Sequence, residues 1–361
     1  MKRIDRYIAW QWFKWFCGLS LIFALAIAAI DFVEQSRTVG ARVDLSPAQL
    51  GWLTCLKLPM LLAEALPFIV LVTSLFTYAR LGRRKELPVI QTSGYSSFSV
   101  LLPSLVMSGL VGAVHLGVLN PAGARTTAAF EQHRAEFLAL MSTGEENRST
   151  VWFKEVTGAG TRLVSGTPLP GQPNTFSNIT LFELNSGGNA GFVRRLMAEQ
   201  GVWAWGSWQL SGVTEQVADA PPNVIGSLVL NSDFDPSSVL AQTITRKTVG
   251  FADLPRFIET RQAAGLPTDK FRMRFAELAA SPLLYFAMAL IGGLACLRLD
   301  RLGQTALRIS VSVLAAIALY LSVQLGISLG AAGQIPVSLA AFGPPLAASF
   351  IGLLLVTANQ H

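Results

Sequence analysis

Six long apolar stretches alternate with polar segments along this chain of 361 residues. A helix needs about 20 mostly apolar residues to cross a bilayer. The stretches that meet this length are Trp10–Ile30, Trp52–Tyr78, Phe98–Leu119, Leu278–Leu297, Ile309–Leu329 and Val337–Thr357. The pattern therefore predicts an α-helical polytopic membrane protein with six transmembrane helices. Kinks are expected at the prolines inside the second and fourth stretches, Pro59, Pro67 and Pro282.

The long segment between the third and fourth apolar stretches has a different pattern. Apolar and polar residues alternate in short runs such as VWFKEV, ITLFEL and VIGSLVL, separated by Gly-Gly, Pro-Gly and Pro-Pro pairs. Alternation with a period of two is typical of half-buried β-strands, and these dipeptides mark turns. We therefore expect an inserted all-β domain, a small sandwich, jelly roll or barrel. The sequence of residues 251–283 predicts a helical connector that leads back into the membrane.

Three tryptophans lie close together in the run WAWGSWQL. If this run is one strand, Trp203 and Trp205 point to one face and Trp208 to the other. Two interpretations of the aromatic pair remain open. The side chains fill the core of the β domain, or they line an apolar groove that accepts an acyl chain.

Composition and charge support the membrane interpretation. The chain is 51% hydrophobic and 14% charged, with a mean hydropathy of +0.46, whereas soluble domains are about one quarter charged. Ten Lys and Arg residues lie at the N-terminus and in the loops after the second and fourth stretches, against two after the first and fifth. This bias predicts cytoplasmic termini and an external β domain. Residues 120–277 hold 14 basic and 15 acidic residues, which excludes a basic surface for nucleic acid there.

The sequence lacks the common signatures of an enzyme. It has no GxxxxGK[ST] phosphate-binding loop, HExxH motif, CxxC pair or GxSxG elbow. Cys17, Cys55 and Cys296 lie in apolar stretches, which predicts packing and not a disulfide or metal site. The first apolar stretch has no small-residue cleavage site after it, so we expect a retained helix. Energy for any transport would come from a partner or an ion gradient.

The segment LGRRKELPVIQTSGYSS, residues 81–97, separates the second and third stretches. Its basic residues fit the charge bias of the cytoplasmic side. Residues 87–92 predict a short helix that ends at Gly94, with Glu86 at its N-terminal end. Two interpretations of Glu86 remain open: the carboxylate caps the helix and interacts with its dipole, or it couples the membrane helices to a cytoplasmic subunit.

A specific pattern in this segment carries a resemblance to a known family. The pattern R-x-E-L-x-V-x-Q-x-S-G-[FY] is formed by Arg84, Glu86, Leu87, Val89, Gln91, Ser93, Gly94 and Tyr95. It resembles the coupling segment of the lipopolysaccharide-transport permeases, the LptF/LptG (YjgP/YjgQ) family. DRYI, DFVEQ, LPMLLAEALPF and SPLLYFAMALIGG follow in the expected order, so the resemblance covers nearly the whole chain. DRYI and FVEQ are most similar to LptG.

The resemblance implies a permease subunit of an ATP-binding-cassette exporter in the inner membrane of a Gram-negative bacterium. Such a permease extracts lipopolysaccharide from the outer leaflet and passes it to a periplasmic bridge. The implied partners are a second LptF-type permease, an LptB-type ATPase dimer that binds ATP and Mg, and an LptC/LptA-type bridge. No cofactor or ATPase site is expected in this chain. The implied coupling residues are Glu86, Arg84 and Leu87.

The resemblance also implies a division of the chain into three parts. Residues 1–121 form transmembrane helices 1–3 with a coupling helix at about 84–94, residues 122–277 a periplasmic β-jelly-roll domain with helical connectors, and residues 278–361 helices 4–6. Basic residues near the outer end of the first helix would bind the phosphates of lipid A. The expected phosphate-binding residues are Arg37, Arg42, Arg125 and Arg134.

Alternatives to these phosphate contacts remain. Arg37 and Arg42 could instead form surface salt bridges with Glu34 and Asp44, each contributing less than about 1 kcal/mol. Asp31 departs from the family pattern, because an LptG-type chain can carry a basic residue there. This departure leaves the set of phosphate contacts open.

Lys57 and Glu64 are charged residues inside the second apolar stretch, where charge is costly. They are seven residues apart and too distant to pair directly. A proton relay is one interpretation, and lining of the permease cavity or an interface is the other. Two further function classes follow as alternatives to an ATP-driven permease. They are a proton-coupled secondary transporter of a lipid and a non-transporting membrane scaffold for the β domain.

Overall fold

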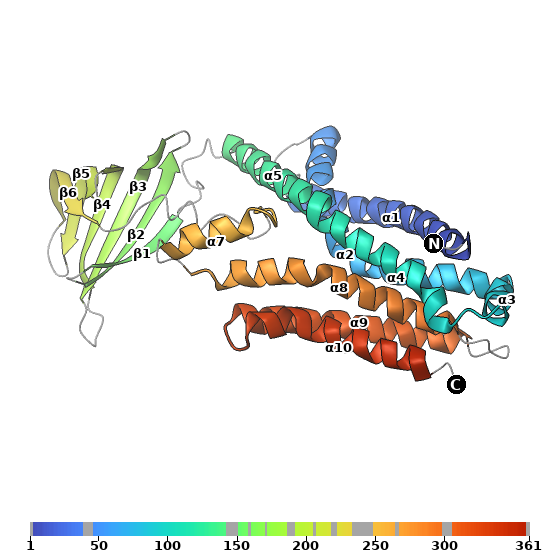
Figure 1. The fold of residues 1–361 in the computed structure, drawn as a ribbon. Helices are drawn as coiled ribbons and strands as arrows, with labels where there is room; N and C mark the ends of the chain where they lie inside the picture. Colours follow the sequence, from blue (N-terminus) through green and yellow to red (C-terminus); the bar gives the residue numbers. More distant parts are fainter. Residues whose placement is uncertain are drawn as a thin grey trace. The chain divides into compact units, whose positions relative to one another are not determined.

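The computed structural model describes residues 3–38, 46–141, 151–157, 160–169, 172–185, 192–204, 207–217, 222–232, 248–263, 267–297 and 305–358. The chain divides into two compact units, which we describe separately. The helical unit comprises Met1–Arg134 and Arg246–His361, and the β unit comprises Ala135–Thr245. The fold class predicted from the sequence, a polytopic helical protein with an inserted β domain, is confirmed. Figure 1 shows the elements of both units.

The helical unit contains the six predicted membrane helices among its described residues. Five of them are α1 (Arg3–Thr38), α2 (Pro47–Arg83), α8 (Asp269–Leu297), α9 (Thr305–Ala331) and α10 (Val337–Ala358). The sixth is formed by α4 (Ser97–Val114), the π-helical turn η1 (His115–Leu119) and α5 (Asn120–Met141), which run on without a break. Shorter helices are α3 (Glu86–Thr92) and α7 (Leu254–Ala263). The predicted helical connector thus consists of α7 and the first turns of α8.

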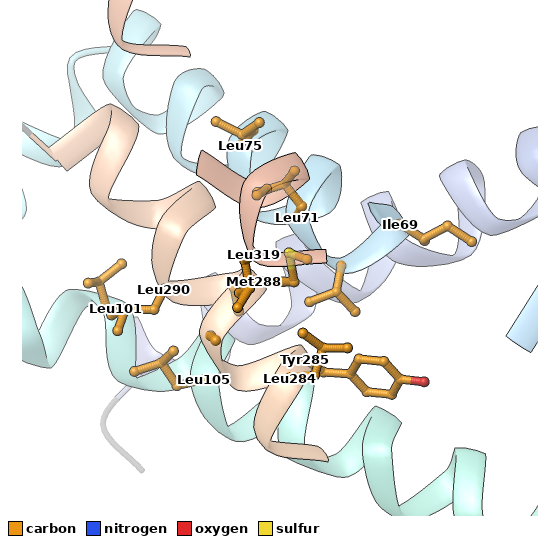
Figure 2. Close-up of a cluster of buried hydrophobic side chains, with 14 of the residues drawn as sticks. Ile69, Leu71, Leu75, Leu101, Leu105, Leu284, Tyr285, Met288, Leu290 and Leu319 are labelled. Carbon is orange, nitrogen blue, oxygen red and sulfur yellow. The ribbon is translucent and has the colours of Figure 1, made fainter. Parts of the chain in front are cut away.

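Helix α8 forms the centre of the helical unit and packs against α2, α4, α9 and α10 (Figure 1). Of its apolar window 72% is buried, against 6% for α1. Figure 2 shows part of the core, whose labelled side chains are Ile69, Leu71, Leu75, Leu101, Leu105, Leu284, Tyr285, Met288, Leu290 and Leu319. A Cβ atom on Gly292 would lie 2.6 Å from the carbonyl oxygen of Leu71. Small residues such as this glycine let helix backbones approach closely in membrane bundles.

The predicted kink prolines lie inside continuous helices. Pro59 and Pro67 fall within α2 and Pro282 within α8. Pro282 also fits against α4, since a Cβ atom on Gly112 would lie 2.7 Å from it. Each proline removes one helical N–H donor and leaves one carbonyl group without its helical partner. In membrane bundles, groups on neighbouring helices can bond to such a carbonyl.

The β unit is one six-stranded antiparallel sheet. Its strands are β1 (Val151–Thr157), β2 (Gly160–Leu169), β3 (Gln172–Asn185), β4 (Phe192–Ala204), β5 (Ser207–Val217) and β6 (Asn223–Asn231), and each pairs with the next. The described strands thus form a meander and lack the Greek-key crossover of a jelly roll. Register shifts interrupt the pairings β2–β3, β3–β4 and β5–β6 and are typical of bends. The sheet curves enough for Arg162 Nη1 of β2 to donate to the Asn231 carbonyl of β6, at 3.2 Å.

The run WAWGSWQL is a hairpin and not the single strand that the sequence suggested. Strand β4 ends at Ala204, β5 begins at Ser207, and Trp203 pairs with Trp208 across the hairpin. Cross-strand partners share a face, so the prediction that they point to opposite faces was wrong. Trp208 is fully buried and Trp203 packs against the same core, as the core-filling interpretation expects. Trp205 lies outside the described residues, and the acyl-chain groove stays a prediction.

Candidate functional site

The segment between α2 and α4 forms the predicted short helix. Helix α3 begins at Glu86, directly after Lys85, whose φ of 58° is left-handed. The turn that reverses the chain is closed by bonds from Arg84 N to the Arg80 carbonyl (3.0 Å) and from Lys85 N to the Gly82 carbonyl (2.9 Å). Gly94 has a φ of 89° after the last turn. This geometry holds α3 at the end of α2 and fixes the position of Glu86.

Helix α3 has one buried face and one exposed face. Leu87 is 1% exposed and belongs to the core cluster that also contains Ile8 and Leu81. Val89, on the other side, is 63% exposed. The helix therefore presents an apolar side chain and the adjacent carboxylate of Glu86 to its surroundings, while Leu87 anchors it.

Glu86 is held by a residue that the sequence interpretation did not select. The hydroxyl of Tyr7, in α1, donates a hydrogen bond of 2.9 Å to Glu86 Oε2. Arg84 Nη1 lies 3.9 Å from Glu86 Oε1, with Arg84 exposed and Glu86 half-buried, so this long ion pair at the surface contributes less than about 1 kcal/mol. The only sequence signal for this contact was that the DRYI motif, which contains Tyr7, and the α3 motif, which contains Glu86, occur in the same chain. It does not specify a contact between residues 79 positions apart.

The C-terminal part of α1 carries a second polar contact. Lys57 Nζ of α2 donates to Asp31 Oδ1 at 2.6 Å, with Asp31 only 3% exposed. The ring of Phe130 in α5 lies 5.9 Å from the same Nζ. Lys57 therefore has in Asp31 the partner that an intramembrane cation requires.

The structure describes three of the four arginines predicted to bind phosphate. Arg37 is exposed in the last turn of α1 and forms no ion pair with Glu34 within the described part of the chain. Arg125 is exposed on α5, and Arg134 continues the face of α5 that carries the buried Phe130. Nine residues separate the two arginines, so they lie on opposite faces of the helix. Arg42 and Asp44 are outside the described residues.

Comparison with protein families matches almost the whole chain. The model of the family described as "Lipopolysaccharide export system permease LptF/LptG" matches residues 6–358. With the six apolar helices and the inserted sheet, this match defines the chain as a polytopic membrane permease. The protein belongs to the LptF/LptG family of lipopolysaccharide export permeases. A comparison with individual curated proteins finds no match.

Proposed function

We propose that this chain is the LptG-like permease subunit of an ATP-driven exporter that extracts lipopolysaccharide from the outer leaflet of the inner membrane. It acts with a second LptF-type permease, an LptB-type ATPase dimer that binds ATP and Mg, and an LptC/LptA-type bridge that receives the lipid. The observation that carries this proposal is α3. An anchored surface helix with an exposed Val89 and the carboxylate of Glu86 suits docking into a partner groove.

Coupling depends on how α3 is attached to the membrane helices. Leu87 joins α3 to the core, and Tyr7 joins Glu86 to α1. A displacement of α3 would therefore be transmitted both to α1 and to the connection between α2 and α4. Arg84 is exposed next to Glu86 and is available to an acidic group of the ATPase. The Lys and Arg distribution supports cytoplasmic termini and a periplasmic β unit.

The outer end of α1 is the proposed contact for the lipid phosphates. Arg37 is exposed there, and a guanidinium binds phosphate with two parallel hydrogen bonds. Arg42, Arg125 and Arg134 are further proposed contacts, of which Arg134 shares the α5 face that meets Lys57 through Phe130. Lys57 is engaged by Asp31, so the exposed arginines are the first groups that a phosphate meets.

Reconstitution tests the proposed coupling. The chain is co-expressed with the partner permease and the ATPase, and Glu86→Lys is compared with Glu259→Lys, a charge reversal on the exposed surface of α7. We expect Glu86→Lys to lose the co-purifying ATPase and to reduce lipopolysaccharide extraction at least tenfold, while the control retains both. ATP hydrolysis by the isolated chain, or proton-coupled flux without an ATPase, would contradict the proposal and favour a different transport class.

A further inference from the structure

The N-terminal part of α1 carries a stripe of basic and aromatic side chains that the proposed coupling and phosphate contacts do not use. The stripe consists of Arg3, Arg6, Trp10 and Lys14, and all four residues are exposed. Their spacing of three, four and four residues places them on one face of the helix. The buried Trp12, which bonds to α2, lies on the opposite face. The basic–aromatic stripe is therefore turned away from the helical core.

Lys14 is the member of the stripe that most needs a partner. It lies inside the first apolar stretch, where a charge is costly. Its Nζ lies 5.3 Å from the centroid of the Trp10 ring, one turn toward the N-terminus, and Trp10 stacks on Phe13 at 5.8 Å. The lysine thus extends back toward the membrane surface, as long basic side chains near helix ends do. Within the described part of the chain no carboxylate lies within ion-pair distance of this ammonium group, so the described fold leaves its charge to a group from the surroundings.

The region around the stripe is strongly basic. Residues 3–14 and 80–86, which the hydrogen bond between Tyr7 and Glu86 brings together, hold seven Lys or Arg residues and two acidic residues. Glu86 is engaged by Tyr7, and Asp5 lies on the opposite side of α1 from the stripe. A cluster of about four to eight basic residues at a membrane surface attracts anionic lipid headgroups. The charge of this region therefore complements an anionic lipid.

The aromatic part of the stripe favours a lipid over a soluble anion or an acidic protein surface. Trp10 is 55% exposed and Phe13 is 40% exposed at the start of the first apolar stretch, and aromatic rings are enriched at this level of a membrane. Further into the stretch Cys17 and Gly18 are exposed, and no described atom lies within 4 Å of a Cβ atom on Gly18. These small residues leave a shallow strip on α1 along which an acyl chain can lie.

The spacing of the cations suits one phosphate group. Arg6 and Lys14 are eight residues apart, which is about 12 Å along the helix axis. Lys14 covers about half of this distance by reaching back to Trp10, and the long side chain of Arg6 covers the rest. We propose that the basic–aromatic stripe binds an anionic phospholipid, whose phosphate accepts hydrogen bonds from Arg6 and Lys14 beside the Trp10 ring.

This lipid site belongs to α1 alone and requires neither the ATPase nor a partner permease. The lipid is bound by its phosphate at the N-terminal end of the helix and is a structural neighbour of the chain, separate from the exported substrate. The absence of such binding would leave the proposed coupling through α3 intact, and loss of coupling would leave the lipid site intact.

Native mass spectrometry of the full-length chain in detergent tests the site, with phosphatidylglycerol and phosphatidylcholine of equal acyl chains as probes. We expect the first phosphatidylglycerol to bind about fivefold more tightly than the first phosphatidylcholine, and Lys14→Gln to reduce this preference about threefold. Lys85→Gln is the matched control, because it removes the same charge from an exposed residue at the same end of the membrane helices, and it should retain the preference. Equal binding of the two lipids, a preference unchanged in Lys14→Gln, or an equal loss in both variants overturns the proposal.

Photocrosslinking in nanodiscs locates the lipid without removing any charge. The probe p-benzoylphenylalanine is placed at Phe13, beside Trp10, or at Phe98, an exposed ring at the start of α4. The nanodiscs contain equal amounts of phosphatidylglycerol and phosphatidylcholine. We expect position 13 to crosslink about threefold more phosphatidylglycerol than phosphatidylcholine, and position 98 to crosslink both equally. Equal crosslinking from position 13, or crosslinking to a second copy of the chain in place of lipid, overturns the proposal.

Discussion

Two polar contacts attach α1 near its ends, and both join residues far apart in the sequence. Tyr7 donates to Glu86, and Lys57 donates to Asp31. Between them, Trp12 Nε1 donates to Ser74 Oγ at 3.0 Å. The sequence identified Glu86 through a local motif and Lys57 through the cost of intramembrane charge. Their partners could not be inferred, because pairing across 79 and 26 residues depends on how the helices pack.

The Tyr7 hydroxyl should contribute to coupling beyond its effect on stability. Tyr7→Phe keeps the ring and removes the donor to Glu86. A hydrogen bond at an exposed site is worth about 0.5–1 kcal/mol, so we expect lipid extracted per ATP hydrolysed to fall about two- to fivefold in the reconstituted complex. In a Glu86→Ala background the same substitution should have no further effect. An additive loss in the double variant would show that Tyr7 acts elsewhere.

Asp31 and Lys57 should behave as a pair. Asp31→Asn leaves Lys57 without its counter-charge in a site that is one quarter exposed. We expect a loss of about 1–3 kcal/mol, below the figure for a fully buried pair because water reaches the lysine. Thermal unfolding of the detergent-solubilised chain measures this loss. The double variant with exchanged charges, Asp31→Lys with Lys57→Asp, should recover part of the lost stability. A double variant that is no more stable than Asp31→Asn would contradict the pairing.

At the scale of elements, helices and strands follow local pattern more closely than their ends and partners do. The six apolar stretches were predicted because a run of about 20 apolar residues is a local property. The helices extend beyond them: α2 runs from Pro47 to Arg83, since polar residues at the membrane surface continue a helix without penalty. The hairpin between Ala204 and Ser207 was missed because Trp205-Gly206 is not one of the dipeptides that mark a two-residue hairpin, although the odd spacing of Trp203 and Trp208 breaks the alternation there.

Packing of α8 on α2 should be sensitive to one methyl group. In Gly292→Ala the new Cβ atom would meet the carbonyl oxygen of Leu71 at 2.6 Å, and backbone cannot rotate away as a side chain can. We expect a destabilisation of about 1–3 kcal/mol from overpacking, measured by thermal unfolding. Gly109→Ala in α4, where nothing lies within 4 Å, is the matched control and should be neutral. Equal effects of the two substitutions would refute the close helix contact.

The β unit should lose stability in acid through a ladder of charges across β2, β3, β4 and β5. Arg162 and Arg194 donate to Glu183, and Arg194 also donates to Glu215. Burial alone would raise the pKa of Glu183, but the hydrogen bonds from both arginines prevail and lower this pKa below its ordinary value of 4.5. The stabilisation is therefore full above pH 4.5 and is lost as pH falls through the lower pKa of the folded form.

Pepsin cleavage of the full chain between pH 5 and pH 3 measures this loss. We expect β3 and β4 to become accessible over that range. Glu183→Gln should already be more accessible at pH 5 and should change less as the pH falls, because it has no proton to gain. An identical pH profile for both proteins would exclude Glu183 as the source of acid sensitivity.

At the scale of the whole molecule, burial is unevenly distributed over the membrane helices. Only 6% of the apolar window of α1 and 17% of that of α9 are buried, against 72% for α8. Leu21, Ile22 and Leu25 of α1 are each more than 60% exposed. Lipid tails or the helices of a partner must cover these faces. This distribution fits a chain that assembles with partner subunits, as the family implies.

The exposed face of α1 should be required for assembly with the partner permease. Leu25→Asn places an uncompensated amide on that face, at a cost of about 1–3 kcal/mol if the amide is covered. We expect less partner to co-purify, measured by affinity isolation of the co-expressed complex. Val106→Asn, on an exposed position of α4, serves as comparison and should retain the partner. Full recovery of partner with Leu25→Asn would assign that face to lipid.

Helix α1 is unbroken from Arg3 to Thr38, so a rotation about the Tyr7 contact would carry Arg37 with it as part of one rigid element. Thirty residues of helix separate them by about 45 Å. If α1 turned by 10° about the Tyr7 contact, Arg37 would sweep through about 8 Å, more than the width of a phosphate group. A small rotation at the N-terminal end of α1 would thus move its C-terminal end by several ångströms, and the Asp31–Lys57 contact would have to break for this to happen.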